Sequence, residues 1–138
     1  MTQEPSHSPA IDLPDVLEEV RAVFARYEDA LVNNRVDVLD ELFWTDARTI
    51  RYGAGENLYG IEAIRAFRLA RPSQGLARTL QRTVITTYGR HAATAMTEFR
   101  REGSSKVGRQ SQTWARMPEG WRVVAAHVSV IDEPPSGA

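Results

Sequence analysis

The chain has 138 residues, of which 42% are hydrophobic and 25% are charged, and its formal net charge is −1. This length allows one hydrophobic core of ordinary size but not two. The balance of 17 basic against 18 acidic residues argues against a nucleic-acid or acidic-membrane surface, which needs clustered basic charge. Cysteine is absent, which excludes disulfides, thiolate nucleophiles and sulfur-ligated metals.

The sequence shows neither a membrane-spanning run nor a secretory signal. No apolar run approaches the roughly 20 residues that span a bilayer, and residues 1–10 lack the charged start and apolar stretch of a signal peptide. We therefore expect a cytoplasmic protein. The polar, proline-rich ends predict flexible tails over residues 1–11 and 133–138, around one domain over residues 12–132.

The first half of this domain has the spacing of three helices. Asp12 and Pro14 form a helix-start signature, and apolar residues then recur at three- and four-residue intervals as far as about Asn33. A second, short helix is predicted over residues 36–43. A third is predicted over residues 61–69.

The rest of the domain has the pattern of strands. Two short strands are predicted on either side of a Gly53-Ala54-Gly55 turn, over residues 49–52 and 57–59. Four longer stretches rich in Thr, Val or aromatic residues follow, separated by glycine-containing turns. They cover residues 77–88, 92–101, 107–117 and 121–131.

This order of elements predicts an α+β fold in which a strongly curved antiparallel sheet packs on three N-terminal helices to form a half-open cone. Such a cone could hold a small anionic molecule. The last strand is apolar on both faces from Val123 to Val130, so a second subunit is the natural cover for the face without helices. We therefore expect a homodimer or higher homo-oligomer formed through the sheet.

Tyr27 and Arg51 are the first candidate site residues. Tyr27 lies on the apolar stripe of the first helix, where it is either a core aromatic or a phenol that donates a proton to a substrate. Arg51 alternates with two apolar neighbours and points away from them. It either meets an acid at the rim or clamps a substrate carboxylate with two hydrogen bonds. A buried guanidinium needs an anion, for which Glu98 and the substrate are the candidates.

The third and fourth long strands supply further candidates. Gln110, Gln112 and Trp114 share one face, and carboxamides that both donate and accept hydrogen bonds suit a urea-like ligand. The alternative is an outward, subunit-facing position, because period-two alternation cannot say which face is inner. His127 is either a general base or a core histidine, and with Asp46 or Glu98 it would form the pair that an isomerase or dehydratase needs.

Other patterns carry less chemistry. The groupings Arg65-Arg68-Arg71 and Arg100-Arg101 are typical of solvated faces. Only one histidine has a suitable position and cysteine is absent, so we expect no metal site. Glycine-rich phosphate loops are absent as well, and no cofactor is expected.

Six strings stand in order along the chain: FARYEDAL (residues 24–31), DELFW (40–44), RTIRYG (48–53), ENLYG (56–60), GRQSQTW (108–114) and GWRVVAAHVS (120–129). They resemble the AtzH-like family. The order of elements over about residues 13–131 resembles the wider nuclear-transport-factor-like (SnoaL-like, cystatin-type cone) superfamily. AtzH-like proteins accompany amidases in the bacterial catabolism of nitrogen-rich compounds such as cyanuric acid and oxalurate.

The resemblance implies an amidase-like hydrolase or decarboxylase that converts 1,3-dicarboxyurea, an N-carboxylated urea, into allophanate. It implies Tyr27 and Arg51 as the catalytic pair, with no cofactor. The alternative is a non-catalytic ligand-binding or accessory module of a partner amidase encoded nearby.

Overall fold

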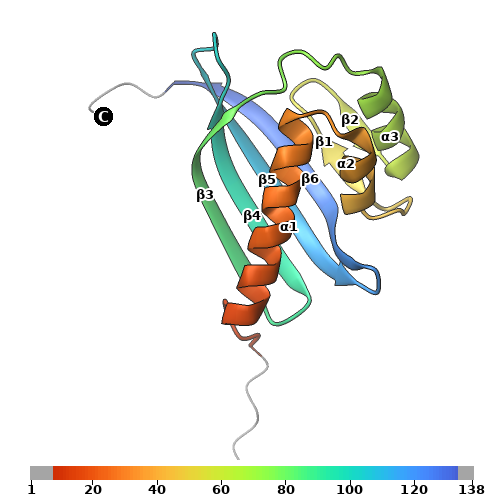
Figure 1. Cartoon of the computed structure of the whole chain (residues 1–138), viewed down its shortest axis with the longest axis vertical. Coiled ribbons are helices and arrows are strands. Elements are labelled where there is room, and N and C mark those ends of the chain that lie inside the picture. Colours follow the sequence, from red (N-terminus) through yellow and green to blue (C-terminus); the bar gives the residue numbers. More distant parts are fainter. Residues whose placement is uncertain (1–7, 134–138) are drawn as a thin grey trace, which may run out of the picture.

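Three helices and six strands make up the computed structural model, which describes residues 8–133 (Figure 1). The helices are α1 (Pro14–Val32), α2 (Val36–Leu42) and α3 (Ile61–Ala70). The strands are β1 (Ile50–Tyr52), β2 (Asn57–Tyr59), β3 (Thr79–Tyr88), β4 (Ala92–Arg100), β5 (Lys106–Met117) and β6 (Gly120–Asp132). The α+β class and the predicted order of elements are confirmed.

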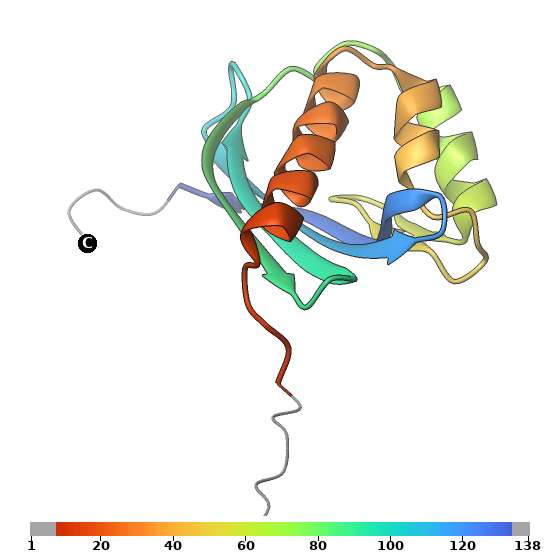
Figure 2. The same ribbon diagram turned by 60° about the horizontal axis from the view of Figure 1, so that its bottom comes forward.

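All six strands belong to one sheet, in the order β2-β1-β6-β5-β4-β3. Strands β3 to β6 form an antiparallel meander. The sheet bends around α1, and all three helices lie on its concave side (Figures 1 and 2). Register shifts at Leu80/Arg82 and at Thr113/Trp114 fit this curvature, because a bulge bends and twists the strand that carries it. The expected half-open cone is therefore the observed shape.

One pairing differs from the predicted antiparallel sheet. Strand β1 runs parallel to β6, with Arg51 opposite Ala126, while its other edge pairs antiparallel with β2. The pattern of a strand only three residues long contains no information about the direction of a partner so distant in sequence.

The hydrophobic core lies between α1 and the inner face of the sheet, which is the face toward the helices. Helix α1 contributes a stripe at three- and four-residue spacing, namely Val16, Val20, Phe24, Tyr27 and Leu31. Trp114 and Val123, both 0% exposed, face it from β5 and β6. Fully burying side chains of this size stabilises the fold by about 1.5–3 kcal/mol each.

The segment before α1 is not entirely a tail. Ile11 forms an isolated bridge with Tyr88, and the backbone N–H of Gly89 donates to the Ala10 carbonyl at 2.8 Å. These contacts extend the edge of the sheet beside β3. Most of the two predicted tails, residues 1–7 and 134–138, lies outside the described residues.

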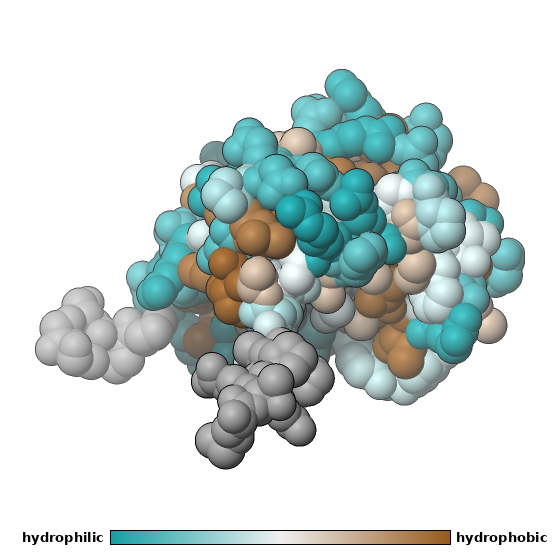
Figure 3. Space-filling model, turned by 90° about the horizontal axis from the view of Figure 1, so that it is seen from below, coloured by the Kyte–Doolittle hydropathy of each residue, from teal (hydrophilic) through white to brown (hydrophobic). Residues whose placement is uncertain are grey.

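The outer face of the sheet is open along its length in this chain. Val84 and Met96 are 45% and 50% exposed there. Hollows of about 440 and 320 Å³ lie on this face, the first around Met96 and the second around His127. The lower end of the molecule, by contrast, is largely hydrophilic, with small separate hydrophobic patches (Figure 3).

Candidate functional site

Strand β1 turns the Arg51 side chain to the inner side of the sheet. Ile50 and Tyr52 stand opposite Ala125 and His127 of β6 and share their outer face, so Arg51 projects the other way. Its side chain is only 12% exposed. The prediction that Arg51 lies opposite its two neighbours is confirmed.

The partner of Arg51 is an acid close to it in sequence. Its Nη1 donates to Oε1 of Glu56 at 3.0 Å. Gly53 makes room for this contact, since a Cβ there would lie 1.8 Å from Glu56 Oε1. Glu98, the internal candidate proposed from the sequence, is exposed on the outer face. It is therefore excluded as the partner, because strand alternation places it on the far side of the sheet.

Tyr27 lies on the inner side as well. It is 4% exposed, and its ring lies 6.3 Å from that of Phe43. Its hydroxyl forms no hydrogen bond within residues 8–133, and the hydroxyl oxygen is not fully occluded from water. Tyr27 is thus a core aromatic whose hydroxyl has no hydrogen-bond partner among the described residues.

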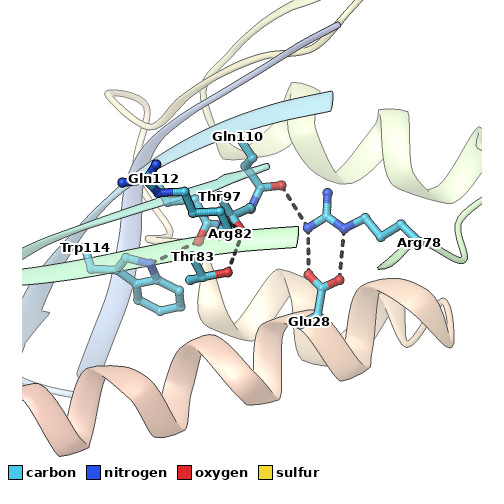
Figure 4. Close-up of polar contacts among 8 residues, drawn as sticks. All are labelled: Glu28, Arg78, Arg82, Thr83, Thr97, Gln110, Gln112 and Trp114. Atoms are coloured by element: carbon cyan, nitrogen blue, oxygen red, sulfur yellow. Dashed lines mark hydrogen bonds and ion pairs between the residues drawn. The ribbon is translucent and has the colours of Figure 1, made fainter. Parts of the chain in front are cut away.

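The three candidates on β5 face the helices. Gln112 and Trp114 are 1% and 0% exposed, and the indole Nε1 of Trp114 donates to Gln112 Oε1 at 3.1 Å. Gln110 is 3% exposed, and its Oε1 accepts from Arg78 at 3.2 Å (Figure 4). Trp114 belongs to the core, whereas Gln110 borders the charged end of the cone. The Nε2 atoms of both glutamines are buried and lack a partner among the described residues.

An ion pair joins α1 to the segment before β3. Arg78 holds the Glu28 carboxylate with two hydrogen bonds, from Nε at 2.9 Å and Nη2 at 2.6 Å (Figure 4). The guanidinium also lies 4.4 Å from the centre of the Phe99 ring. Phe99 of β4 pairs with Gly108 of β5. A Cβ at Gly108 would lie 2.1 Å from the Phe99 ring. This glycine therefore makes room for the aromatic platform under Arg78.

A second buried ion pair lies under α3. Arg68 is 3% exposed, donates to Asp40 at 3.0 Å and stacks 4.1 Å from the Phe43 ring centre. Burial lowers the pKa of this guanidinium, and the interactions with Tyr27 and Asp40 oppose the shift. The expectation that Arg68 belongs to a solvated face is wrong.

Arg71 follows α3 directly and is half-buried without an acid. Its Nε and Nη2 atoms are occluded from water and have no hydrogen-bond partner within the described chain. Burial is the largest cause of the lowered pKa of Arg71, and repulsion from Arg51 is the second. Interactions with Tyr27 and Glu56 oppose the shift. Arg71 thus lies within electrostatic reach of both predicted catalytic residues.

Arg101 follows β4 and is in a similar state. Its Nε is buried and lacks a partner among residues 8–133, and its guanidinium lies 4.9 Å from the centre of the Phe99 ring. Burial lowers its pKa, and repulsion from Arg78 and then Arg71 adds to the shift. The cone therefore has a cationic end, which we define as Arg51, Arg71, Arg78 and Arg101 together with Tyr27 and Gln110.

His127 does not join this group. It is exposed on the outer face, where its ring meets that of Tyr52 at 5.8 Å. Asp46 is bound by Arg48 at 2.9 Å, which lowers the pKa of its carboxyl. Neither Asp46 nor Glu98 forms a buried pair with His127, so the histidine–carboxylate pair suggested by the sequence is not formed by these residues.

The sequence contained a signal for the missed arginines. Residues 61, 64, 68 and 71 recur at three- and four-residue intervals, and Ile61 and Ile64 are buried. Arg68 therefore continues a buried helical stripe, and Arg71 follows directly after the last helical residue, Ala70. Arg65, three residues before Arg68, lies at the edge of this stripe, where its side chain is 39% exposed.

No three His, Asp or Glu side chains among residues 8–133 gather as a metal site requires. None of the helices in this range is long and apolar enough to cross a membrane.

Comparisons with known proteins place the chain in a family. The AtzH-like family model matches residues 9–134, so the chain belongs to the AtzH-like family. A protein of unknown function from the DUF3225 family of Pectobacterium atrosepticum SCRI1043 is 67% identical, with a TM-score of 0.87 over 88% of this chain and 95% of that chain.

Further solved structures support the fold. A cystatin-like fold protein from Burkholderia xenovorans LB400 is 45% identical, with a TM-score of 0.88 over 91% of this chain and 99% of that one. A nuclear transport factor 2-like superfamily protein from Salmonella enterica is 25% identical, with a TM-score of 0.70 over 89% and 96%. The nuclear-transport-factor-like fold is thus shown. No curated protein matches the chain.

Proposed function

We propose that this chain is a cofactor-independent, amidase-like hydrolase/decarboxylase that breaks a C–N bond of a small N-carboxylated urea, with 1,3-dicarboxyurea as substrate and allophanate as product. The observation that carries the proposal is the unpaired Tyr27 hydroxyl on the same inner side as the Arg51 guanidinium. Both residues act electrostatically on Arg68 and Arg71. Membership of the AtzH-like family directs the choice of substrate.

Substrate binding is the task of Arg51 in this proposal. Its guanidinium is pre-positioned by Glu56 and by the Phe67 ring, whose centre lies 5.4 Å away. A carboxylate that approaches it gains charge-assisted hydrogen bonds in a site largely shielded from water. Gln110 lies on the same side, and its unpaired Nε2 can donate to the urea carbonyl.

Tyr27 supplies the proton. As the bond between a carboxylate carbon and its nitrogen breaks, the electron pair moves to the nitrogen, which takes the proton of the phenol. The carboxylate leaves as carbon dioxide, and water returns a proton to Tyr27. Overall, the 1,3-dicarboxyurea dianion and one proton give the allophanate monoanion and carbon dioxide. General acid catalysis typically contributes about 10²- to 10⁴-fold.

A second candidate is a ligand-binding or accessory module of a partner amidase. The composition of the inner site favours it, since the described residues there provide guanidiniums, amides, a phenol and ion-paired carboxylates but no imidazole. Such a set binds an anion well and lacks a conventional base for activating water. The purified chain alone separates the two candidates.

The test measures allophanate formation from freshly prepared 1,3-dicarboxyurea by the purified chain and compares it with a protein-free blank at the same pH. Tyr27→Phe and Arg51→Gln should each lower kcat/KM by about 10²-fold or more. Exposed residues of the same types provide matched controls, Tyr59→Phe and Arg21→Gln, and these should leave turnover unchanged. Substrate loss equal to the blank would favour the accessory module. Full activity in both site variants would overturn the assignment of Tyr27 and Arg51.

For the outer face we propose a second copy of this chain as the partner. Exposed Val84 and Met96 lie beside a cross-strand row in which Glu98 stands between Arg82 and Arg109. This row is complementary in charge to itself when a second copy faces it around a two-fold axis. A homodimer through the sheet would bury the exposed apolar residues.

A further inference from the structure

Arg78 shows how this site holds a carboxylate. Its Nε and Nη2 form one edge of the guanidinium, and this edge holds both oxygens of Glu28 at 2.9 and 2.6 Å. Planar two-point pairing of this kind is the strong geometry for a guanidinium and a carboxylate. The guanidinium lies over Phe99, which fixes its plane.

Arg71 presents the same edge without an anion. The same two atoms, Nε and Nη2, are those that lack a hydrogen-bond partner within residues 8–133. Leaving buried donors of a charged group unpaired is unfavourable. No salt bridge to Arg71 or Arg101 is formed in the described chain, whereas Arg51, Arg68 and Arg78 each have an acid within 3.0 Å.

The charges at this end of the cone therefore do not balance. Arg51 and Arg78 are compensated by Glu56 and Glu28, which leaves the positive charges of two guanidiniums uncompensated. The two act on each other, because repulsion from Arg71 contributes to the lowered pKa of Arg101. A guest with a single negative charge satisfies only one of the two excess charges.

We propose that Arg71 and Arg101 form a second carboxylate subsite, so that the site selects short dianions with a carboxylate at each end. One carboxylate lies at Arg51, the other lies at Arg71 and Arg101, and the central carbonyl accepts from Gln110 Nε2. This inference rests on the proposed function only for the identity of the dianion. Both Arg71 and Arg101 follow the last residue of their element, α3 and β4 respectively, where a long side chain can adjust as the guest enters.

The two subsites differ in a way that fits the proposed reaction. Arg51 already shares its charge with Glu56, and so it holds a carboxylate less firmly than an unpaired guanidinium does. The carboxylate at Arg51 is the one that leaves as carbon dioxide near Tyr27. The carboxylate at Arg71 and Arg101 is the one that remains in allophanate.

The test uses glutarate as a stable probe, because three atoms separate its carboxylate carbons, as in 1,3-dicarboxyurea. Glutaramate, in which one carboxylate is a neutral carboxamide, is the matched monoanion. Calorimetric titration of the wild-type chain should give a Kd for glutarate about 10-fold or more below that for glutaramate. In Arg71→Gln and Arg101→Gln this preference should fall to within about 3-fold. Arg21→Gln, an exposed arginine, should keep it.

Arg71→Lys serves as the conservative variant, since it keeps the charge but loses the two-point edge, and it should show an intermediate preference. Thermal melting of each variant confirms that it is folded. A wild-type chain that does not prefer glutarate, or Gln variants that keep the full preference, would overturn the subsite. The proposed function fails separately. If the wild-type chain prefers glutarate but does not turn over 1,3-dicarboxyurea, the enzyme proposal fails and the subsite stands. If the chain turns over 1,3-dicarboxyurea but the Gln variants keep the full preference for glutarate, the subsite fails and the enzyme proposal stands.

Discussion

The two faces of the sheet hold their polar side chains in different ways. On the inner face Gln110 and Gln112 are at most 3% exposed, and each has one amide atom paired and one unpaired. On the outer face, Arg109 of β5 and Glu98 of β4 are exposed, and Arg109 donates to Ser129. Strand alternation alone produces this difference.

The inner face also changes along its length. At one end Trp114 packs with Val16, Val20 and Val123 in the core. At the other end, beyond Gln110, the cationic side chains replace apolar ones. The comparison teaches that one side of one strand can serve both folding and binding. Residues that stabilise the fold and residues that hold a guest are then separable by mutation.

Trp114→Ala should have the largest effect and should sharpen this separation. The side chain is fully buried, and its removal leaves a cavity and an unpaired Gln112 oxygen. The free energy of unfolding should fall by about 3–5 kcal/mol, measured by urea denaturation. Trp44→Ala, a half-buried tryptophan outside the core cluster, serves as the control and should cost less. An equal loss in both variants would contradict the assignment of Trp114 to the core.

Met96→Glu tests what the outer face is for. Met96 is 50% exposed and lines the hollow of about 440 Å³. Burying this charge in a self-association interface without a partner is unfavourable, so the dimer Kd should rise by about 10-fold or more in analytical ultracentrifugation. Leu69→Glu, at an exposed leucine on α3, should leave the dimer intact. A wild-type chain that sediments as a monomer throughout would contradict the proposed interface.

His127→Ala should have the smallest effect. The imidazole lies on the outer face against Tyr52 and away from Arg51. Turnover of 1,3-dicarboxyurea should stay within about 2-fold of wild type, since the residue touches neither subsite. A loss of turnover as large as that of Tyr27→Phe would contradict this placement and would support the alternative that His127 is a general base.

Much of the fold could be read from the sequence. Apolar spacing in α1 and glycine-containing turns between the long strands predicted the elements, because both signals are local. The parallel pairing of β1 with β6 could not be predicted, since it joins Arg51 to Ala126 across most of the chain. The choice of inner face was also open, as a period of two is symmetric about the sheet.

The site was predicted in part. Arg51 was placed correctly relative to Ile50 and Tyr52 from alternation alone. Its partner was not, because Glu98 was proposed without knowledge of which face of the sheet is inner. Arg68 was placed on the wrong face because its charge was given more weight than its position on the stripe of Ile61 and Ile64. Charge describes a side chain in water, whereas helical spacing indicates where the backbone directs it.

The most direct measurement is a crystal structure of the chain grown with glutarate. The account predicts one guest molecule on the inner side of the sheet, with one carboxylate at Arg51 and the other at Arg71 and Arg101. It also predicts that the Tyr27 hydroxyl is in contact with the guest. Glutarate bound only in the hollows around Met96 and His127, with the inner arginines unchanged, would contradict it.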